Sequence, residues 1–155
     1  QRSDSELIDA LEIESNAFEQ AVENFENSDW SNRLFCYHVP LQEFREEIDE
    51  KYDLIISNPP YFNDSFKALK EDRTIARHTD QLNFFELLSS SATPLSEKGN
   101  CAFIIPYKEE ENFIQIARDN GLYQSRITRV KGNSKSTLKR SLLQLSSKDI
   151  SPEIN

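Results

Sequence analysis

Long apolar runs and paired cysteines are both missing from this sequence of 155 residues. No run approaches the roughly 18 apolar residues that a membrane-spanning helix needs, so we expect no membrane association. Cys36 and Cys101 lack the spacing of a zinc site or a disulfide framework. We therefore expect two buried thiols of a cytoplasmic protein and no bound metal. The hydrophobic content of 37% is typical of a globular domain with one core.

Acidic side chains dominate the sequence, which carries a net charge of −9, but they are scarce toward its C-terminal end. Residues 1–50 hold three basic and 14 acidic side chains, whereas residues 126–155 hold seven and two. Between Arg126 and Lys148 there is no acidic residue. The total charge argues against a protein that coats nucleic acid indiscriminately, yet the basic end permits a local phosphate-binding face.

Apolar runs alternate with helical spacings of apolar residues, which predicts an α/β fold with a mostly parallel sheet. Two alternating segments flank a turn-rich, basic stretch over 131–136, which predicts a C-terminal hairpin and an antiparallel last strand. We expect Ser15 to cap the first helix. We expect strands over 7–13, 33–39, 52–57, 101–105, 122–130 and 139–146, and a loop over 63–80. We expect helices over 15–27, 41–48, 82–92 and 109–120. The third of these helices should face inward with Leu82, Phe85, Leu88 and Ser89.

The motif Asn58-Pro59-Pro60-Tyr61 follows the clearest buried strand, at the sheet edge where open α/β folds bind ligands. The prolines stiffen the turn, so that the side-chain oxygen of Asn58 and the carbonyl of Pro59 can be aimed as acceptors at one point. An exocyclic amino group that donates both hydrogens to them is drawn toward tetrahedral geometry, which frees its lone pair for methylation. Tyr61 adds a flat face for stacking a base. The motif predicts methylation of a planar amino nitrogen; an ordinary strand-to-turn junction is the alternative.

Glu12 ends the first predicted strand. A carboxylate in that position can accept hydrogen bonds from both ribose hydroxyls of a nucleotide cofactor. Glu14 is a second candidate, although its side chain should point to the opposite face of the strand. A solvated acid in an acid-rich segment is the alternative interpretation of either residue.

A family resemblance rests on DLIISNPPYF, the later Ala76-Arg77-His78-Thr79, GNCAFIIP and the basic hairpin. Together they resemble the bacterial tRNA adenine-N6 methyltransferases, and among these the ones that modify nucleotide 37 of a valine tRNA. The resemblance covers nearly the whole chain and implies a Rossmann-like class I fold, S-adenosylmethionine as cofactor and tRNA as partner. It also implies that Glu12 binds the cofactor ribose, that Ile13 packs on its adenine, and that residues 58–61 hold the target base.

The chain departs from this family in two places. Many relatives have an aspartate that contacts the cofactor adenine, but Pro40 stands there, and we expect Leu41 to pack on the ring instead. The family's glycine-rich loop and the central strand before it are also missing. Because the sequence begins with Gln1 rather than Met, we expect a fragment whose first strand lies before residue 1. Its methyltransferase domain would span 1–149, with a tail over 150–155.

Cationic side chains supply the predicted contacts with RNA. The predicted loop carries Arg77 and His78, which can meet substrate phosphate, and solvated charges are the alternative. The best phosphate-binding patch lies on the hairpin and consists of Lys131, Lys135, Lys139 and Arg140. The 58–61 motif also occurs in release-factor glutamine methyltransferases, so a protein glutamine methyltransferase is an alternative function. A non-catalytic methyltransferase-like module is a second alternative.

Overall fold

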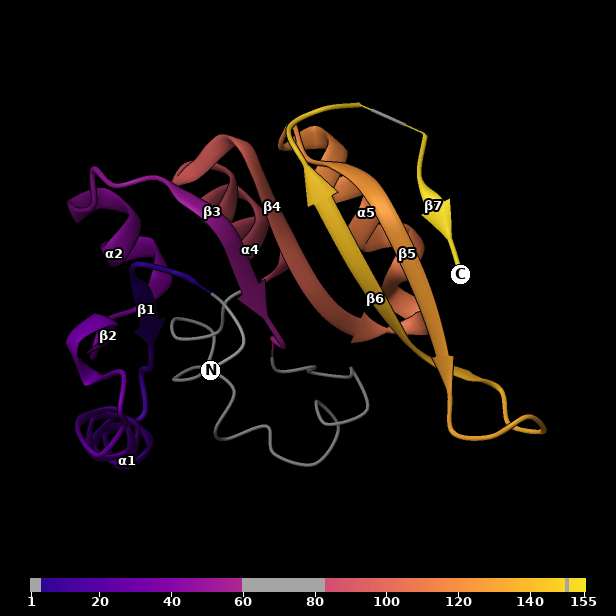
Figure 1. Cartoon of the computed structure of the whole chain (residues 1–155). Coiled ribbons are helices and arrows are strands. Elements are labelled where there is room, and N and C mark those ends of the chain that lie inside the picture. The colour runs from indigo at the N-terminus through magenta and orange to yellow at the C-terminus, as the bar shows by residue number, and fades with distance from the viewer. Residues whose placement is uncertain (1–3, 60–82, 150) are drawn as a thin grey trace, which may run out of the picture. The chain divides into compact units, whose positions relative to one another are not determined.

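Two compact units, residues 1–48 and 49–155, make up the chain. We describe each by itself from a computed structural model, which describes residues 4–59, 83–149 and 151–155 (Figure 1). No helix in these ranges is long and apolar enough to cross a membrane.

The first unit is a small β–α–β arrangement (Figure 1). Strand β1 (Ile8–Leu11) pairs in parallel with β2 (Leu34–Tyr37), so that Ile8 lies opposite Leu34 and Leu11 opposite Tyr37. Helix α1 (Ser15–Glu26), the 3₁₀ turn η1 (Ser31–Arg33) and helix α2 (Leu41–Glu47) complete the unit.

The predicted N-cap of α1 is wrong by one residue. Glu14, not Ser15, caps the helix, since its carboxylate accepts hydrogen bonds from the backbone N–H groups of Asn16 and Ala17 at 3.1 and 2.7 Å. Backbone donation from Ala17 and then Asn16 lowers the pKa of Glu14 below its ordinary value. The longer side chain of glutamate can thus take the place of the short polar side chain that usually caps a helix.

The second unit contains a five-stranded sheet in the order β3-β4-β6-β5-β7. Strand β3 (Tyr52–Ser57) is parallel to β4 (Leu95–Pro106), and β6 (Leu138–Ser146) is antiparallel to both β4 and β5 (Tyr123–Lys131). The predicted hairpin with its antiparallel last long strand is therefore confirmed. The two-residue strand β7 (Glu153–Ile154), in the segment expected to be a tail, pairs in parallel with β5.

Helices α4 (Phe84–Ala92) and α5 (Glu110–Asp119) cover one face of this sheet, and η4 (Tyr107–Glu109) links β4 to α5 (Figure 1). Cys101, Phe103 and Ile105 alternate along β4 and point into the core, where the Phe103 ring meets that of Phe113 at 5.3 Å between centroids. This alternation is typical of a strand with one face buried in the core.

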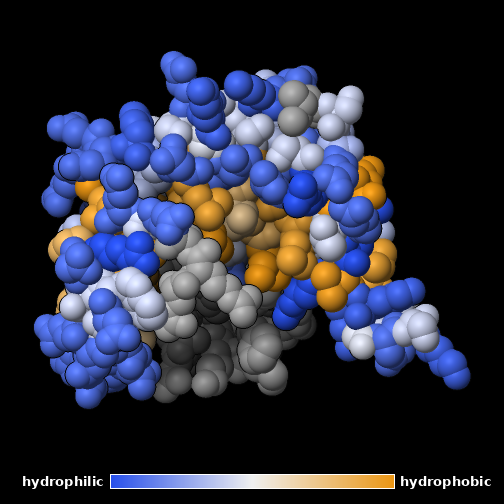
Figure 2. All heavy atoms as spheres, in the orientation of Figure 1, coloured by the Kyte–Doolittle hydropathy of each residue, from blue (hydrophilic) through white to orange (hydrophobic). Residues whose placement is uncertain are grey.

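The opposite face of the sheet keeps apolar side chains exposed, and hydrophobic residues gather there in Figure 2. Leu54 and Ile56 of β3 are 55% and 70% exposed, and Ile104 and Leu142 on the next strands are 36% and 39% exposed. Within the described residues no strand pairs with the outer edge of β1 or of β3.

Two predictions about helix α4 and strand β4 need correction. The inward stripe of α4 is Phe84, Leu87, Leu88 and Ser91. Asn83 caps the helix, and a reciprocal hydrogen bond with Glu86 fixes where it begins. Phe85, predicted to face inward, is 58% exposed, and Leu82 lies outside the described residues.

Strand β4 begins at Leu95 rather than at residue 101, so Gly99 lies within the strand instead of turning into it. A Cβ at Gly99 would stand 2.7 Å from Leu95 Cδ1 and 2.8 Å from the carbonyl oxygen of Tyr52. The missing side chain lets β3 approach β4 at the point where their register is irregular.

Candidate functional site

The carboxyl end of β1 presents Glu12 and Ile13. Glu12 Oε1 accepts hydrogen bonds from the backbone N–H groups of Ile13 and Glu14 at 2.8 and 2.9 Å. Among the described residues Glu12 Oε2 receives no hydrogen bond, which leaves it as an acceptor for a hydroxyl. Ile13 is 60% exposed and therefore offers an apolar face beside that acceptor.

His38 supports this turn from the end of β2. Its Nε2 lies 3.2 Å from the carbonyl oxygen of Ile13, and its ring stacks on Phe18 with 4.9 Å between centroids and 14° between planes. The His38 ring thus connects the turn at Ile13 to helix α1.

Leu41 is the first residue of α2, and Pro40 caps that helix with an extended backbone (φ −64°, ψ 149°). Proline is favourable there because the first helical N–H groups have no intrahelical partner. Leu41 is half-buried, so part of its side chain is accessible beside the ends of β1 and β2. Glu12, Ile13 and Leu41 are therefore all found in the first unit.

Asn58 and Pro59 directly follow β3, with Asn58 exposed and Pro59 buried. Pro60, Tyr61, Arg77 and His78 lie outside the described residues. Because β3 is parallel to β4, Asn58 lies at the same sheet edge as Pro106, the last residue of β4. The described half of the motif is therefore at a carboxyl edge, as the sequence predicts.

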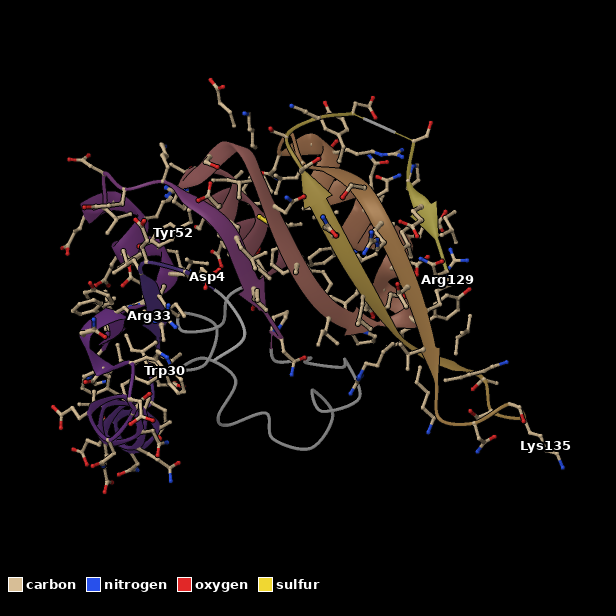
Figure 3. The ribbon with its side chains drawn as sticks, in the orientation of Figure 1. Asp4, Trp30, Arg33, Tyr52, Arg129 and Lys135 are labelled. Carbon is tan, nitrogen blue, oxygen red and sulfur yellow. The ribbon has the colours of Figure 1, made fainter. Side chains whose placement is uncertain are left out.

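The hairpin cations lie at this same edge of the second unit. Strand β5 runs in the direction of β4, since both are antiparallel to β6, and its C-terminal end leads into the hairpin (Figure 1). Lys135 projects at the tip of the hairpin (Figure 3). The four predicted cations, Lys131, Lys135, Lys139 and Arg140, are all exposed.

An ion-pair network near that edge was missed by the sequence reasoning. Glu110, the first residue of α5, is 8% exposed and accepts a hydrogen bond from Arg129 Nη2 at 2.7 Å. Arg129 Nε lies 3.1 and 3.2 Å from the two carboxylate oxygens, and Ser141 Oγ donates to Oε2 at 2.5 Å. Burial alone would raise the pKa of Glu110, but the bonds from Arg129 and Ser141 outweigh it and lower that pKa.

The sequence does carry one signal of this network. Arg129 stands two residues after Ile127, so strand alternation places it on the face that packs against the helices. Ile127 is buried, and Ser141 is opposite Arg129 in the ladder. A charge in such a register requires a partner, and the guanidinium also lies 5.8 Å from the centroid of the Tyr107 ring.

The prediction of two buried thiols is confirmed for Cys101 and wrong for Cys36. Cys101 is completely buried, and desolvation raises the pKa of its thiol to about 12. Cys36 is half-buried, and burial together with the charge of Glu12 raises its pKa. Within residues 4–59, 83–149 and 151–155 no group of three His, Cys, Asp or Glu side chains is arranged to hold a metal ion.

Known structures share this architecture. A methyltransferase from Pyrococcus furiosus matches 93% of this chain and 64% of its own length with a TM-score of 0.59 and 20% identity. A TehB-like SAM-dependent methyltransferase from Corynebacterium glutamicum matches 92% of this chain and 68% of its own length, with a TM-score of 0.58 and 14% identity. The fold is that of the Rossmann-like methyltransferases. The model of the Eco57I restriction-modification methylase family matches residues 2–130, and the chain belongs to that family.

Curated relatives are much closer in sequence. A protein of Christiangramia forsetii named tRNA1(Val) (adenine(37)-N6)-methyltransferase is 54% identical over 145 residues, which are 92% of this chain. A protein of the same name from Flavobacterium johnsoniae is 51% identical over 151 residues, or 97% of this chain. The chain spans 60% and 64% of the lengths of these two relatives.

The residues at the end of β1 fit the adenosine part of S-adenosylmethionine. Glu12 Oε2 can accept from a ribose hydroxyl while Oε1 is held in place by two backbone donors. The exposed side chain of Ile13 can cover one face of an adenine ring. Pro40 carries no polar side-chain atom, so it provides no contact to the adenine amino group.

Proposed function

We propose that this chain is the larger part of an S-adenosylmethionine-dependent methyltransferase that modifies the exocyclic N6 of an adenine in tRNA, at nucleotide 37 of a valine tRNA. The observation that carries this proposal is the position of Asn58 and Pro59 immediately after β3. They lie at the sheet edge that also carries the hairpin cations. The names of the two relatives supply the identity of the RNA and of the nucleotide.

Asn58 has the chemistry that the target nitrogen requires. The adenine N6 amino group donates one hydrogen to the side-chain oxygen of Asn58 and the other to the carbonyl oxygen of Pro59. Accepting from both hydrogens reduces delocalisation of the N6 lone pair into the ring. No strong general base is required, because the nitrogen becomes acidic once it carries the additional methyl group. Proline at position 59 leaves few backbone conformations and so limits the motion of both acceptors.

Glu12, Ile13 and Leu41 are proposed to hold the cofactor. Glu12 would accept from the ribose, and Ile13 and Leu41 would pack on the adenine. S-adenosylmethionine, when bound, supplies an electrophilic methyl group. The cations Lys131, Lys135, Lys139 and Arg140 would contact RNA phosphates, as would Arg77 and His78 from the segment after the motif. Since the substrate is tRNA, we also propose a cytoplasmic location.

Mass spectrometry of tRNA from cells that lack the gene tests the proposal. Loss of one N6-methyladenosine from valine tRNA, restored by the intact gene, is the expected result. Undermethylated release factor with unchanged tRNA would instead identify a protein glutamine methyltransferase. Unchanged methylation of both would overturn the proposal and favour a non-catalytic module.

Replacement of the acceptor gives a sharper test. In protein expressed from the complete gene, Asn58→Ala should reduce methylation of valine tRNA by about 100-fold or more, because it removes a hydrogen bond that strengthens as the nitrogen reacts. Circular dichroism should show an unchanged fold, since Asn58 is exposed. Asn112→Ala, an equally exposed asparagine on α5, is the matched control and should keep full activity. Retained activity in Asn58→Ala would contradict the assigned role.

A further inference from the structure

Tyr107 lies beside the proposed target site, yet neither the motif nor the hairpin cations account for it. It follows Pro106, the last residue of β4, and its side chain remains partly accessible, with 38% of the residue exposed. Strand β4 neighbours β3, and Ser57 at the end of β3 pairs with Phe103. Tyr107 stands four residues beyond Phe103, and Asn58 stands one residue beyond Ser57, so the two are offset by about 10 Å along the strand direction. This is a separation of one or two nucleotides from a base held at Asn58.

Arg129 covers this ring and is itself held rigidly. Its guanidinium carbon lies 5.8 Å from the centroid of the Tyr107 ring. Three short contacts to the Glu110 carboxylate fix the orientation of the guanidinium, and Ser141 Oγ donates to the same carboxylate. A planar cation over an aromatic face stabilises the ring by a cation–π interaction. The Tyr107 ring is thus oriented before any ligand arrives.

The charge of Arg129 argues for stacking and against a phosphate contact. Glu110 neutralises the guanidinium by a bidentate pair, so little positive charge is available to attract a phosphate. Lys131, Lys135 and Lys139 differ, because within the described residues they form no ion pair. The exposed lysines at this edge are therefore suited to phosphates. The Tyr107 ring, with the neutralised Arg129–Glu110 pair beside it, is suited to stacking on the flat face of a base.

We propose that Tyr107 stacks on the base of a nucleotide that flanks the target adenine, and that Arg129 and Glu110 position its ring. This inference rests on the proposed function, because it assumes an RNA substrate. Tyr107 touches the substrate and is a binding residue, whereas Arg129 and Glu110 act only through it. Stacking tolerates any base, so the platform contributes affinity and alignment and does not select a sequence.

The salt dependence of binding separates stacking from phosphate contact. Protein from the complete gene and a labelled anticodon stem-loop of valine tRNA would be titrated by fluorescence anisotropy at several salt concentrations. Tyr107→Ala should weaken binding by about 5- to 150-fold at every salt concentration, with the slope of log K against log salt unchanged. Tyr107→Phe should bind as the unmodified protein does. Lys135→Ala should instead reduce the slope by about 0.7 to 0.9.

Tyr123→Ala is the matched control, because Tyr123 begins β5 at the opposite edge of the same sheet and is partly accessible. It should leave RNA binding unchanged. In the methylation assay Tyr107→Ala should raise KM with kcat nearly constant, the signature of lost binding that is equal in ground and transition states. Arg129→Lys keeps the charge but not the planar pair and should raise KM in the same direction.

Three results would overturn the inference. Tyr107→Ala could bind RNA like the unmodified protein, its loss of affinity could come with a reduced salt slope, or Tyr107→Phe could be as weak as Tyr107→Ala. If Arg129→Lys leaves KM unchanged, the positioning role is wrong. A failure of the proposed function is distinguishable, because the unmodified protein would then neither bind nor methylate the tRNA.

Discussion

Replacing the Glu110 carboxylate with the neutral amide of glutamine removes the centre of the network on the sheet. Glu110→Gln keeps the shape of the side chain, but its neutral amide offers one acceptor oxygen instead of two and cannot form the charged bidentate pair with the Arg129 guanidinium. Arg129 Nη2 and Nε donate to this carboxylate at 2.7 to 3.2 Å, and Ser141 Oγ donates at 2.5 Å. Ser141 is completely buried, so its hydroxyl has no access to water as an alternative partner.

The loss of stability can be bounded from these contacts. Hydrogen bonds to a charged group contribute about 1.5–3 kcal/mol, and breaking a fully buried ion pair costs about 3–5 kcal/mol. The side chain of Arg129 is 34% exposed, so solvent screens the pair and the lower range applies. We expect Glu110→Gln to lower the free energy of unfolding of the second unit by about 2 kcal/mol. With a urea slope of about 2 kcal/mol per M, the midpoint should fall by about 1 M.

Hydrogen exchange of amides in β5 and β6 during urea unfolding is the suitable assay. Trp30, the single tryptophan, belongs to the first unit, so its fluorescence does not report on this network. Glu111→Gln, an exposed neighbour on the same helix, is the matched control and should change stability by less than about 0.5 kcal/mol. Equal midpoints for Glu110→Gln and Glu111→Gln would refute the reasoning.

The same carboxylate gives the second unit a pH-dependent stability. Because the folded-state pKa of Glu110 is depressed below the ordinary 4.5, its contribution is fully present above that value. It is lost as the pH falls through the lower pKa of the folded state. The stability difference between the unmodified protein and Glu110→Gln should therefore be constant near pH 7 and shrink below pH 4.5. A difference that persists at pH 2 would show that the pair does not involve an ionised Glu110.

Two further predictions concern close packing. Gly99→Ala should destabilise the second unit by about 1–3 kcal/mol, because its Cβ would stand 2.8 Å from a backbone carbonyl oxygen that cannot move aside. Gly132→Ala is the control and should be nearly neutral, since a Cβ there meets no atom nearer than 3.7 Å. Equal melting temperatures of the two variants would contradict this prediction. Cys101 should resist a thiol reagent at pH 8 until urea unfolds the chain, since burial removes access and raises its pKa to about 12, while the half-buried Cys36 should react in the folded protein. Two equal labelling rates in the absence of urea would contradict this second prediction.

Sequence reasoning succeeded where the determining interactions are local. Helix α5 ends at Asp119, and Gly121 follows it with a φ of 73°, which glycine adopts readily because it has no Cβ. The N–H of Gly121 donates to the carbonyl oxygen of Arg118, and that of Leu122 donates to the carbonyl oxygen of Ala117. The hairpin between β5 and β6 follows from alternation around a turn-rich stretch. The roles of the predicted site residues stay predictions, although Asn58 and the hairpin cations do lie at one sheet edge.

Sequence reasoning failed where the burial or pairing of a residue depends on a partner distant in the sequence. Helix spacing alone could not set the rotation of α4, because the contact of Phe84 with Phe113, at 4.8 Å between centroids, decides which side faces the sheet. Strand β7 was not predicted, because its two residues gain their ladder only from β5, with Asn155 N–H donating to Ile127 at 2.8 Å. Two residues are too few for a periodic pattern.

The sequence by itself determined the strand before Asn58, and it supplied the residue types on which the predicted chemistry of the Asn58-Pro59-Pro60-Tyr61 motif depends. Only the tertiary structure decided that Glu110 is a buried partner of Arg129 and that Gly99 is a point of close strand approach. Residues 110 and 129 are separated by a helix and half a hairpin. Their pairing arises from the position of β5 in the sheet and from the packing of α5 against that sheet.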